Sequence, residues 1–191
     1  MPHDDLLILS FDTSAAQCAA ALVYGDRVLA QKSEAMTKGQ AERLFPMLEE
    51  VLAAGGKIWG DLDRIAVCTG PGNFTGVRIS VSAARGLALS LDIPAVGISA
   101  FEALAFGSEG NTSVVMDARR GQVYRQEFRD GMAIGVPERE IADEVPEPQV
   151  IDPVAVATLA MRALDGVKPS PVYLRPADAA LPSDPPPVIL P

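Results

Sequence analysis

The chain has 191 residues, of which 48% are hydrophobic and 21% are charged. A chain of this length buries roughly 70% of its unfolded surface on folding, so the composition excludes a wholly disordered protein. Sixteen Lys and Arg residues against 25 Asp and Glu residues give a formal net charge of −9. This balance argues against a protein that holds nucleic-acid phosphates without a basic partner.

Targeting signals and the histidine count narrow the function further. The N-terminus is acidic where a secretory signal is basic, and no apolar run reaches the ~18 residues of a membrane helix. We therefore expect a cytoplasmic protein without membrane association, in which Cys18 and Cys68 are small buried hydrophobes. The one histidine, His3, excludes a His-x-x-x-His zinc site. It permits a Ser-His-Asp or Cys-His constellation only if the N-terminal tail supplies the base.

Hydrophobic periodicity predicts an α/β fold in the first half of the chain. The expected strands are residues 6–11, 18–24, 27–32, 64–69 and 95–98, and the expected helices are residues 41–52, 77–91 and 99–106. Capping boxes are expected before the first and third helices, formed by Thr37 with Gln40 and by Ser99 with Glu102. Pro46 either kinks the first helix or marks a late start.

The second half of the chain has a different composition. Strands are expected at residues 114–116 and 121–128, followed by a hairpin turn at Asp130-Gly131. Twelve of the 16 prolines lie from Pro137 onward, which indicates loops and extended chain with one helix near residues 154–164. The tail around residues 185–187 is expected to be poorly ordered or an extended arm. We therefore divide the chain into an N-terminal lobe, 1–107, and a reduced C-terminal lobe, 108–191.

An internal repeat links the two lobes. Asp12 and Asp117 each follow an apolar strand, Gln17 and Gln122 lie five residues further on, and both pairs are separated by 105 residues. Hairpins with Asp and Gly turns also recur by chance, which is the alternative explanation of the repeat.

Polar residues after the first strand and a glycine-rich loop are candidates for a nucleotide cleft. Asp12, Thr13 and Ser14 could hold a hydrated metal and phosphate together with Asp117, although the same residue types also form simple turns. Residues 70–76 join a strand to a helix and could direct N–H groups at an anion. Their spacing, Gly-x-Gly-x-x-x-Gly, matches neither a dinucleotide fold nor a P-loop.

The helices at 41–52 and 77–91 are apolar on more than one face. We expect one face of each helix to lie in the core and another to form a surface for a second subunit. Arg78 lies in the first turn of its predicted helix, where a cation opposes the helix dipole. It therefore either pairs with a carboxylate, binds a partner or is simply solvated.

Five segments of the chain together resemble the bacterial TsaB (YeaZ) family. They are ILSFDTS at residues 8–14, AERLFPM at 41–47, GPGNFTGVRI at 70–79, DARRGQVY at 117–124 and PVYLR at 171–175. The resemblance implies an actin-like, Hsp70-like (ASKHA) fold of two α/β lobes, with mixed sheets flanked by helices and a shortened second lobe. It also implies a role in making threonylcarbamoyladenosine at position 37 of tRNA.

The resemblance further implies that the chain binds partner proteins and has no catalytic activity of its own. TsaB is similar to the catalytic paralogue TsaD but is its non-catalytic partner, so no catalytic or metal-binding residue and no required cofactor are expected in this chain. A TsaD homologue, a TsaE homologue, and ATP with magnesium would act in the complex, and tRNA would be bound only through it. A homodimer is expected when the chain is alone.

The expected interface lies on segments 38–54 and 75–91. Its candidate residues are Glu42, Arg43, Phe45, Met47, Phe74, Thr75, Val77, Arg78 and Val81. The candidate residues of a vestigial nucleotide cleft are Asp12, Thr13, Ser14 and Asp117. Two other functions remain open: an ATP-handling enzyme of the actin-like or sugar-kinase class, which would use Asp12 and Asp117 around magnesium, and a metallopeptidase, which the shortage of histidine disfavours.

Overall fold

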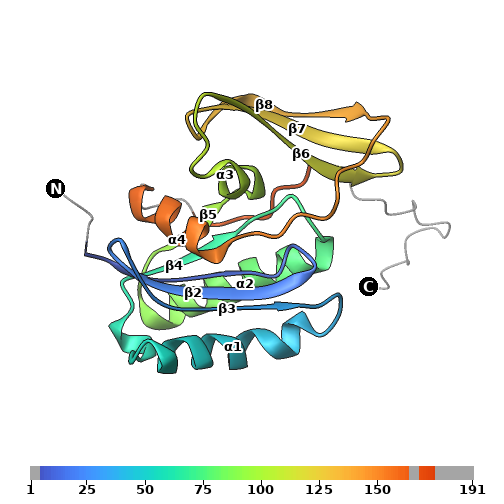
Figure 1. Cartoon of the computed structure of the whole chain (residues 1–191). Helices are drawn as coiled ribbons and strands as arrows, with labels where there is room; N and C mark the ends of the chain where they lie inside the picture. The colour runs from blue at the N-terminus through green and yellow to red at the C-terminus, as the bar shows by residue number, and fades with distance from the viewer. Residues whose placement is uncertain (1–4, 164–167, 175–191) are drawn as a thin grey trace, which may run out of the picture.

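The larger of two β-sheets is mixed and has the strand order β3-β2-β1-β4-β5 (Figure 1). Its strands are β1 (Leu7–Asp12), β2 (Gln17–Tyr24), β3 (Arg27–Ala35), β4 (Arg64–Cys68) and β5 (Ala95–Ile98). The first three form an antiparallel meander, and β4 and β5 join β1 in parallel. This computed structural model describes residues 5–163 and 168–174.

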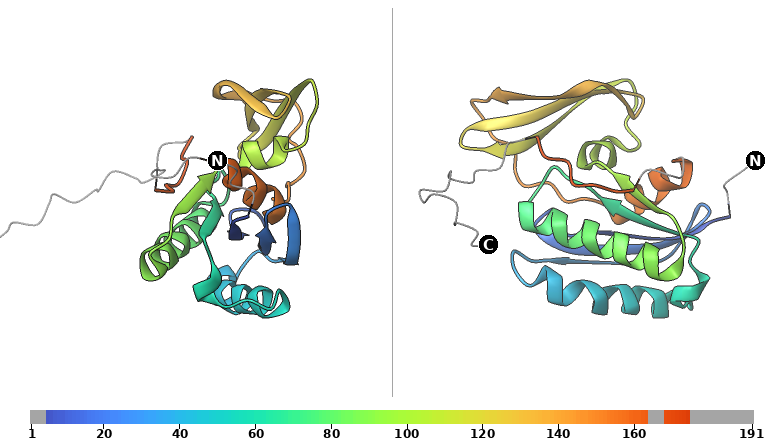
Figure 2. Two further views of the ribbon diagram at one scale, coloured as in Figure 1. Left: turned by 90° about the vertical axis from the view of Figure 1, so that its left-hand side faces the viewer. Right: turned by 180° about the vertical axis from the view of Figure 1, so that it is seen from behind.

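Two helices cover one face of this sheet, α1 (Gln40–Ala54) and α2 (Phe74–Leu91) (Figures 1 and 2). A short 3₁₀ helix, η1 (Trp59–Asp61), follows α1. In β1, Leu9 and Phe11 pack against α1 and α2, while Ile8 packs on the opposite face. This period-2 alternation lets one buried strand serve two hydrophobic cores.

A second, antiparallel sheet lies beyond the opposite face. It consists of β6 (Asn111–Arg119), β7 (Gln122–Arg129) and β8 (Met132–Ile141). The short helix α3 (Ala100–Ala105) lies between the two sheets in Figure 1, and Phe101 packs with Tyr124 and Phe128 in a separate core cluster. The second sheet thus packs on α3 through an apolar contact.

The last helix, α4 (Pro153–Arg162), returns from the second sheet to the larger one. Val156 and Ala160 are buried in the cluster with Ile8, and the Ser10 hydroxyl donates to the Pro153 carbonyl oxygen at 2.6 Å. The buried Arg64 guanidinium donates to the carbonyl of Ala160 near the end of α4. Part of the segment assigned to a C-terminal lobe therefore packs on the first sheet, and the boundary near residue 108 stays a prediction.

The structure confirms the predicted elements of the first half and corrects two expectations about the start of the first helix. Gly39, with φ +85°, precedes α1 without a side-chain cap, so the capping box of Thr37 and Gln40 is wrong; the Gln40 amide donates to the Met36 carbonyl instead. The helix α1 contains Pro46 and begins at Gln40, so a late start is also wrong. The predicted box of Ser99 and Glu102 is present.

The second half contains a strand that the prediction missed. The proline-rich sequence from Pro137 onward predicts loop and extended chain, but the strand β8, at the edge of the second sheet, continues through Pro137 to Ile141. An edge strand tolerates proline because its outer N–H groups need no partner in the sheet. The expectation for residues 185–187 lies outside the described residues. Among the helices described, none has the length and hydropathy needed to cross a membrane.

Candidate functional site

Two concave surfaces are candidates for a functional site, and the first is a cleft between the two sheets. Its volume is about 380 Å³. Residues of the β1–β2 loop, the loop before α2, strand β6 and the segment 147–151 form its walls. Of the four candidate cleft residues, Ser14 and Asp117 line this cavity, so one residue after each of the two equivalent strands lies at the cleft. Asp12 and Thr13 are fully buried.

The Asp12 carboxylate is saturated by its own loop. One of its oxygens accepts the Ser14 N–H at 2.9 Å and the Ser14 hydroxyl at 2.5 Å. The other accepts the Ala15 N–H at 3.3 Å and the Gln17 amide at 3.2 Å. These four donors hold the β1–β2 turn, as expected for the structural role of Asp at turns. Asp12 is therefore buried with all four acceptor positions of its carboxylate occupied by this turn.

Asp117 repeats this turn in the second sheet. Its carboxylate accepts the Arg119 N–H at 2.6 Å, two residues ahead, as Asp12 accepts the N–H of Ser14. Strands β1 and β2 pair as an antiparallel hairpin, and so do β6 and β7. The echo in the sequence thus reflects two equivalent hairpins. The two aspartates differ in burial, because Asp117 is exposed.

The glycine-rich loop is filled by the chain itself. A Cβ at Gly76 would lie 1.9 Å from the Thr13 carbonyl oxygen, and one at Gly72 would lie 2.6 Å from the Ser14 carbonyl oxygen. The Thr13 hydroxyl donates to the Gly76 carbonyl at 2.6 Å. These glycines therefore permit two backbones to touch, which explains their spacing without an anion.

The helix after this loop begins three residues earlier than predicted. Asn73 is its N-cap, and the side-chain oxygen accepts the N–H groups of Thr75 and Gly76 at 3.1 and 3.0 Å. Asparagine is among the preferred N-cap residues, so this start could have been recognised in the sequence. Two of the donors that an anion would use at this helix end are already bonded.

Neither cysteine is an activated nucleophile. Burial raises the pKa of the Cys18 thiol to about 11 and also raises the pKa of the Cys68 thiol. Cys68 lies 3.5 Å from the Ser14 hydroxyl beneath the cleft. Both side chains are fully buried, which confirms the expectation of small buried hydrophobes, and a raised pKa disfavours the reactive thiolate.

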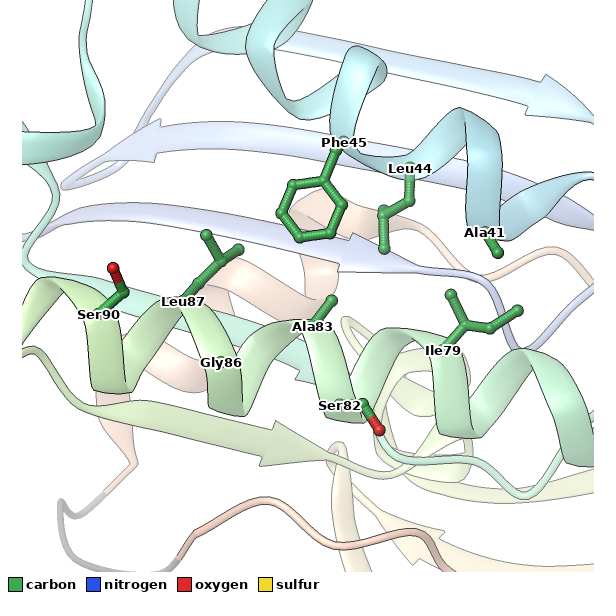
Figure 3. Close-up of a pocket in the computed structure, with 9 residues that line it drawn as sticks. All are labelled: Ala41, Leu44, Phe45, Ile79, Ser82, Ala83, Gly86, Leu87 and Ser90. Carbon is green, nitrogen blue, oxygen red and sulfur yellow. The ribbon is translucent and has the colours of Figure 1, made fainter.

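The second concave surface is a groove between α1 and α2, with a volume of about 550 Å³. Figure 3 shows Leu44 and Phe45 of α1 facing Ile79, Ala83 and Leu87 of α2. The Phe45 ring is 45% exposed although it borders this apolar surface. A half-exposed aromatic ring beside an apolar groove is typical of an interaction surface.

Small residues make up four of the six positions that α2 contributes to the groove. Ser82, Ala83, Gly86 and Ser90 line it. A Cβ at Gly86 would meet no atom within 4 Å, so nothing in the described chain requires a glycine there. Glycine inside a helix costs about 0.5–1 kcal/mol relative to alanine. The small residue therefore leaves room for something outside the chain.

The structure divides the nine candidate interface residues into three groups. Exposed side chains belong to Glu42, Phe45, Phe74, Thr75 and Arg78. Those of Met47, Val77 and Val81 are at most 3% exposed and pack in the core beneath α1 and α2, so the expectation that they form the surface is wrong. The reason is that both helices are apolar on more than one face, and the sequence alone does not show which of these faces lies against the sheet.

Arg43 forms the third group, because it is held by its own chain. Its guanidinium donates to Glu34 and to Glu50 at 2.7 Å each, and Lys32 also contacts both carboxylates. Hydrogen bonds from Arg43 lower the pKa of Glu34 and of Glu50 to about 2. This network joins α1 to β3 and leaves Arg43 committed within the chain.

One surface cluster was not expected from the sequence. The Arg78 guanidinium lies 3.7 Å from the centre of the Phe74 ring and donates from Nε to the Tyr173 hydroxyl at 2.8 Å. The two rings are 5.4 Å apart. Tyr173 reaches this position because the Val172 N–H bonds to the Thr69 carbonyl at 2.9 Å. A contact across 95 residues leaves no local signal in the sequence.

Comparison with known proteins gives a consistent family. A family model described as "TsaD: tRNA N6-adenosine threonylcarbamoyltransferase" matches residues 27–166. The chain is 35% identical over 127 residues, or 64% of its length, to a protein of Escherichia coli named "tRNA threonylcarbamoyladenosine biosynthesis protein TsaB", covering 54% of that protein. It is 38% identical over 132 residues, or 66% of its length, to a Bacillus subtilis protein of the same name, covering 58% of that protein. The chain thus spans little more than half the length of these curated relatives.

A solved structure has the same fold. The structure described as "YeaZ from Pseudomonas aeruginosa" superposes with a TM-score of 0.72 and 24% identity, covering 88% of this chain and 100% of that chain. The two sheets with flanking helices therefore confirm the predicted mixed α/β class, and the superposition shows that this chain shares the fold of that YeaZ structure.

Proposed function

Because the chain belongs to the TsaB (YeaZ) family, we propose that it is a non-catalytic subunit in tRNA threonylcarbamoyladenosine biosynthesis that binds a TsaD homologue through the α1/α2 groove. It would position and activate that subunit, and a TsaE homologue would act with both. Without the TsaD homologue, a second copy of the chain would occupy the same groove. ATP with magnesium would belong to the complex rather than to this chain.

The observation that carries the proposal is the open glycine in the groove. Helices that approach closely do so over small residues, and α2 presents Ser82, Ala83 and Gly86 to the groove. Gly86 lowers the helix propensity of α2 and relieves no clash within the chain. A bulky side chain from a partner helix, inserted at this position, supplies a reason for both facts.

The cleft between the sheets supports the non-catalytic part of the proposal. Asp12 is saturated by four donors of its own loop, and the backbone of Thr13 and Ser14 fills the glycine-rich loop. The only histidine in the 191 residues is His3, so the chain offers no pair of imidazoles for a metal. The net charge of −9 further favours tRNA binding through the complex.

Co-purification with the TsaD homologue of the same genome tests this function. We expect the wild-type chain to form a stable complex and Gly86→Leu to lower the affinity by about 100-fold, because a branched side chain fills the space for the partner. Gly60→Leu is the matched control, since Gly60 also has open space and lies in η1, outside the groove. A wild-type chain that forms no complex, or a Gly86→Leu chain that binds normally, would contradict the proposal.

A further inference from the structure

The two helices that form the groove carry charges of opposite sign on their exposed sides. In α2 the charged residues are Arg78 and Arg85, both exposed, with no acidic residue between Phe74 and Leu91. In α1 the exposed acidic residues include Glu42 and Glu49. Each pair is separated by seven residues, close to two helical turns, so its members lie on one side of their helix.

The arginine pair borders the groove. Arg78 and Arg85 precede the groove residues Ile79 and Gly86 by one position each, which turns them about 100° around the helix from the groove. They thus form a basic ridge on a protein whose net charge is −9. Among the residues that the structure describes, no carboxylate forms a salt bridge with either arginine.

Arg78 differs from Arg85 in being held in place. Its guanidinium stacks on the Phe74 ring at 3.7 Å, and its Nε is bonded to the Tyr173 hydroxyl. These contacts use one face and one N–H of the guanidinium, and they fix the direction of the remaining donors. An arginine fixed in this way loses less side-chain entropy when it binds a carboxylate through two parallel hydrogen bonds.

We propose that the Phe74–Arg78–Tyr173 cluster is an anchor for a carboxylate of the subunit that fills the α1/α2 groove. This inference rests on the proposed function and names the chemistry of its partner: an acidic side chain opposite Arg78, beside a helix that packs over Gly86. Phe74 and Tyr173 are positioning residues that hold the guanidinium. The C-terminal segment thereby contributes to an interface built mainly from α1 and α2.

A carboxylate fits this anchor better than an RNA phosphate. Glu42 and Glu49 on the neighbouring helix make the α1 side of the same surface acidic. A nucleic-acid backbone is a continuous polyanion and would be repelled there, whereas one partner carboxylate meets only Arg78. The acidic ridge of α1 would correspondingly face basic residues of the partner.

The test is the affinity of the full chain for the purified TsaD homologue, measured by biolayer interferometry at several salt concentrations. We expect Arg78→Glu to weaken binding by about 100-fold or more, because it places two like charges together. Arg78→Lys keeps the charge but loses the planar guanidinium, and we expect it to weaken binding by about tenfold. Tyr173→Phe removes only the hydroxyl that accepts from Arg78; we expect about a threefold loss, carried by a faster off-rate with the salt dependence unchanged.

Arg129→Glu is the matched charge control, because Arg129 is exposed on the second sheet and its Nε donates to the side chain of the neutral Asn111. We expect it to change the affinity by less than about threefold through screened, long-range repulsion. A glutamate near the start of α2 suits the helix dipole, so Arg78→Glu should fold, which circular dichroism checks.

The outcomes separate this inference from the proposed function. If Gly86→Leu abolishes the complex and Arg78→Glu binds like Arg129→Glu, the groove is the interface but the anchor is wrong. If Arg78→Glu keeps its affinity for the TsaD homologue and loses tRNA binding by the complex, the anchor takes phosphate, and the proposal is overturned. If the wild-type chain forms no complex, the function itself fails.

Discussion

The cleft between the sheets and the groove between α1 and α2 differ in how many of their groups are already engaged in contacts within the chain. The cleft contains the polar residues that suggest chemistry, but its buried aspartate and its glycine-rich loop are used by the chain itself. The groove contains an exposed Phe45 and an open Gly86, neither of which the chain uses. The comparison indicates that a site is better recognised by what is left unpaired than by residue type.

The largest expected effect is a difference in stability between alanine substitutions at two glycines of α2. At Gly76 an added Cβ would meet the Thr13 carbonyl at 1.9 Å, so Gly76→Ala should lower the free energy of unfolding by about 3 kcal/mol or more. At Gly86 the same change meets nothing, so Gly86→Ala should raise it by about 0.5–1 kcal/mol. Urea denaturation of both variants measures the difference. Equal effects would mean that the two surfaces do not differ as described.

The next prediction concerns the role of Asp12. Asp12→Ala removes a buried acceptor from four donors, so we expect the free energy of unfolding to fall by about 2–3 kcal/mol. Isothermal titration of the wild-type chain with ATP and magnesium should show no binding in the micromolar range. Tight binding that Asp12→Ala abolishes would instead favour the ATP-handling enzyme.

A smaller effect is expected on the affinity of the groove for its partner. Gly86→Ala adds one methyl group to a space that a partner helix is proposed to fill, so its affinity for the TsaD homologue should fall by about tenfold. The same variant should be more stable when alone. Stability that rises while affinity falls is the signature of a glycine kept for a partner, and a parallel change in both would argue against it.

The smallest expected effect is a pH dependence at the edge of α1. Arg43 lowers the pKa of Glu34 and Glu50 from 4.5 to about 2 in the folded chain. Their stabilising contribution is complete above the ordinary pKa and is lost as the pH falls from 4.5 towards 2. In Arg43→Met the folded pKa values return towards normal, so stability should fall less steeply over this window. Urea denaturation at a series of pH values measures the slope, and an unchanged slope would show that Arg43 does not hold these carboxylates.

Local patterns in the sequence predicted most of the fold. The alternation of β1 and the repeat of Asp12 and Asp117 correctly indicated the buried sheet and the two hairpins. The edge strand β8 is not evident in the sequence, because Pro137 is more typical of a loop than of a strand interior. The patterns also could not separate the inner and outer apolar faces of α1 and α2, which is why Val81 was placed on the surface.

The candidate site was less predictable than the fold because it depends on distant contacts. Asp12 and Ser14 have the residue types of a phosphate site, and only the hydrogen bonds show that they serve a turn. The link between Arg78 and Tyr173 requires the path of the last described segment over β4. Gly86 could be noticed in the sequence, but its open surroundings could not.

The central claim is that this chain acts by occupying the surface of another subunit and not by its own chemistry. Reconstitution with the TsaD and TsaE homologues, tRNA, ATP and the threonylcarbamoyl donor, followed by mass spectrometry of the tRNA nucleosides, tests it most directly. We predict modified adenosine when the wild-type chain is included, a strongly reduced yield with Gly86→Leu, and none from the chain alone. Modification by the chain alone, or a full yield with Gly86→Leu, would contradict the account.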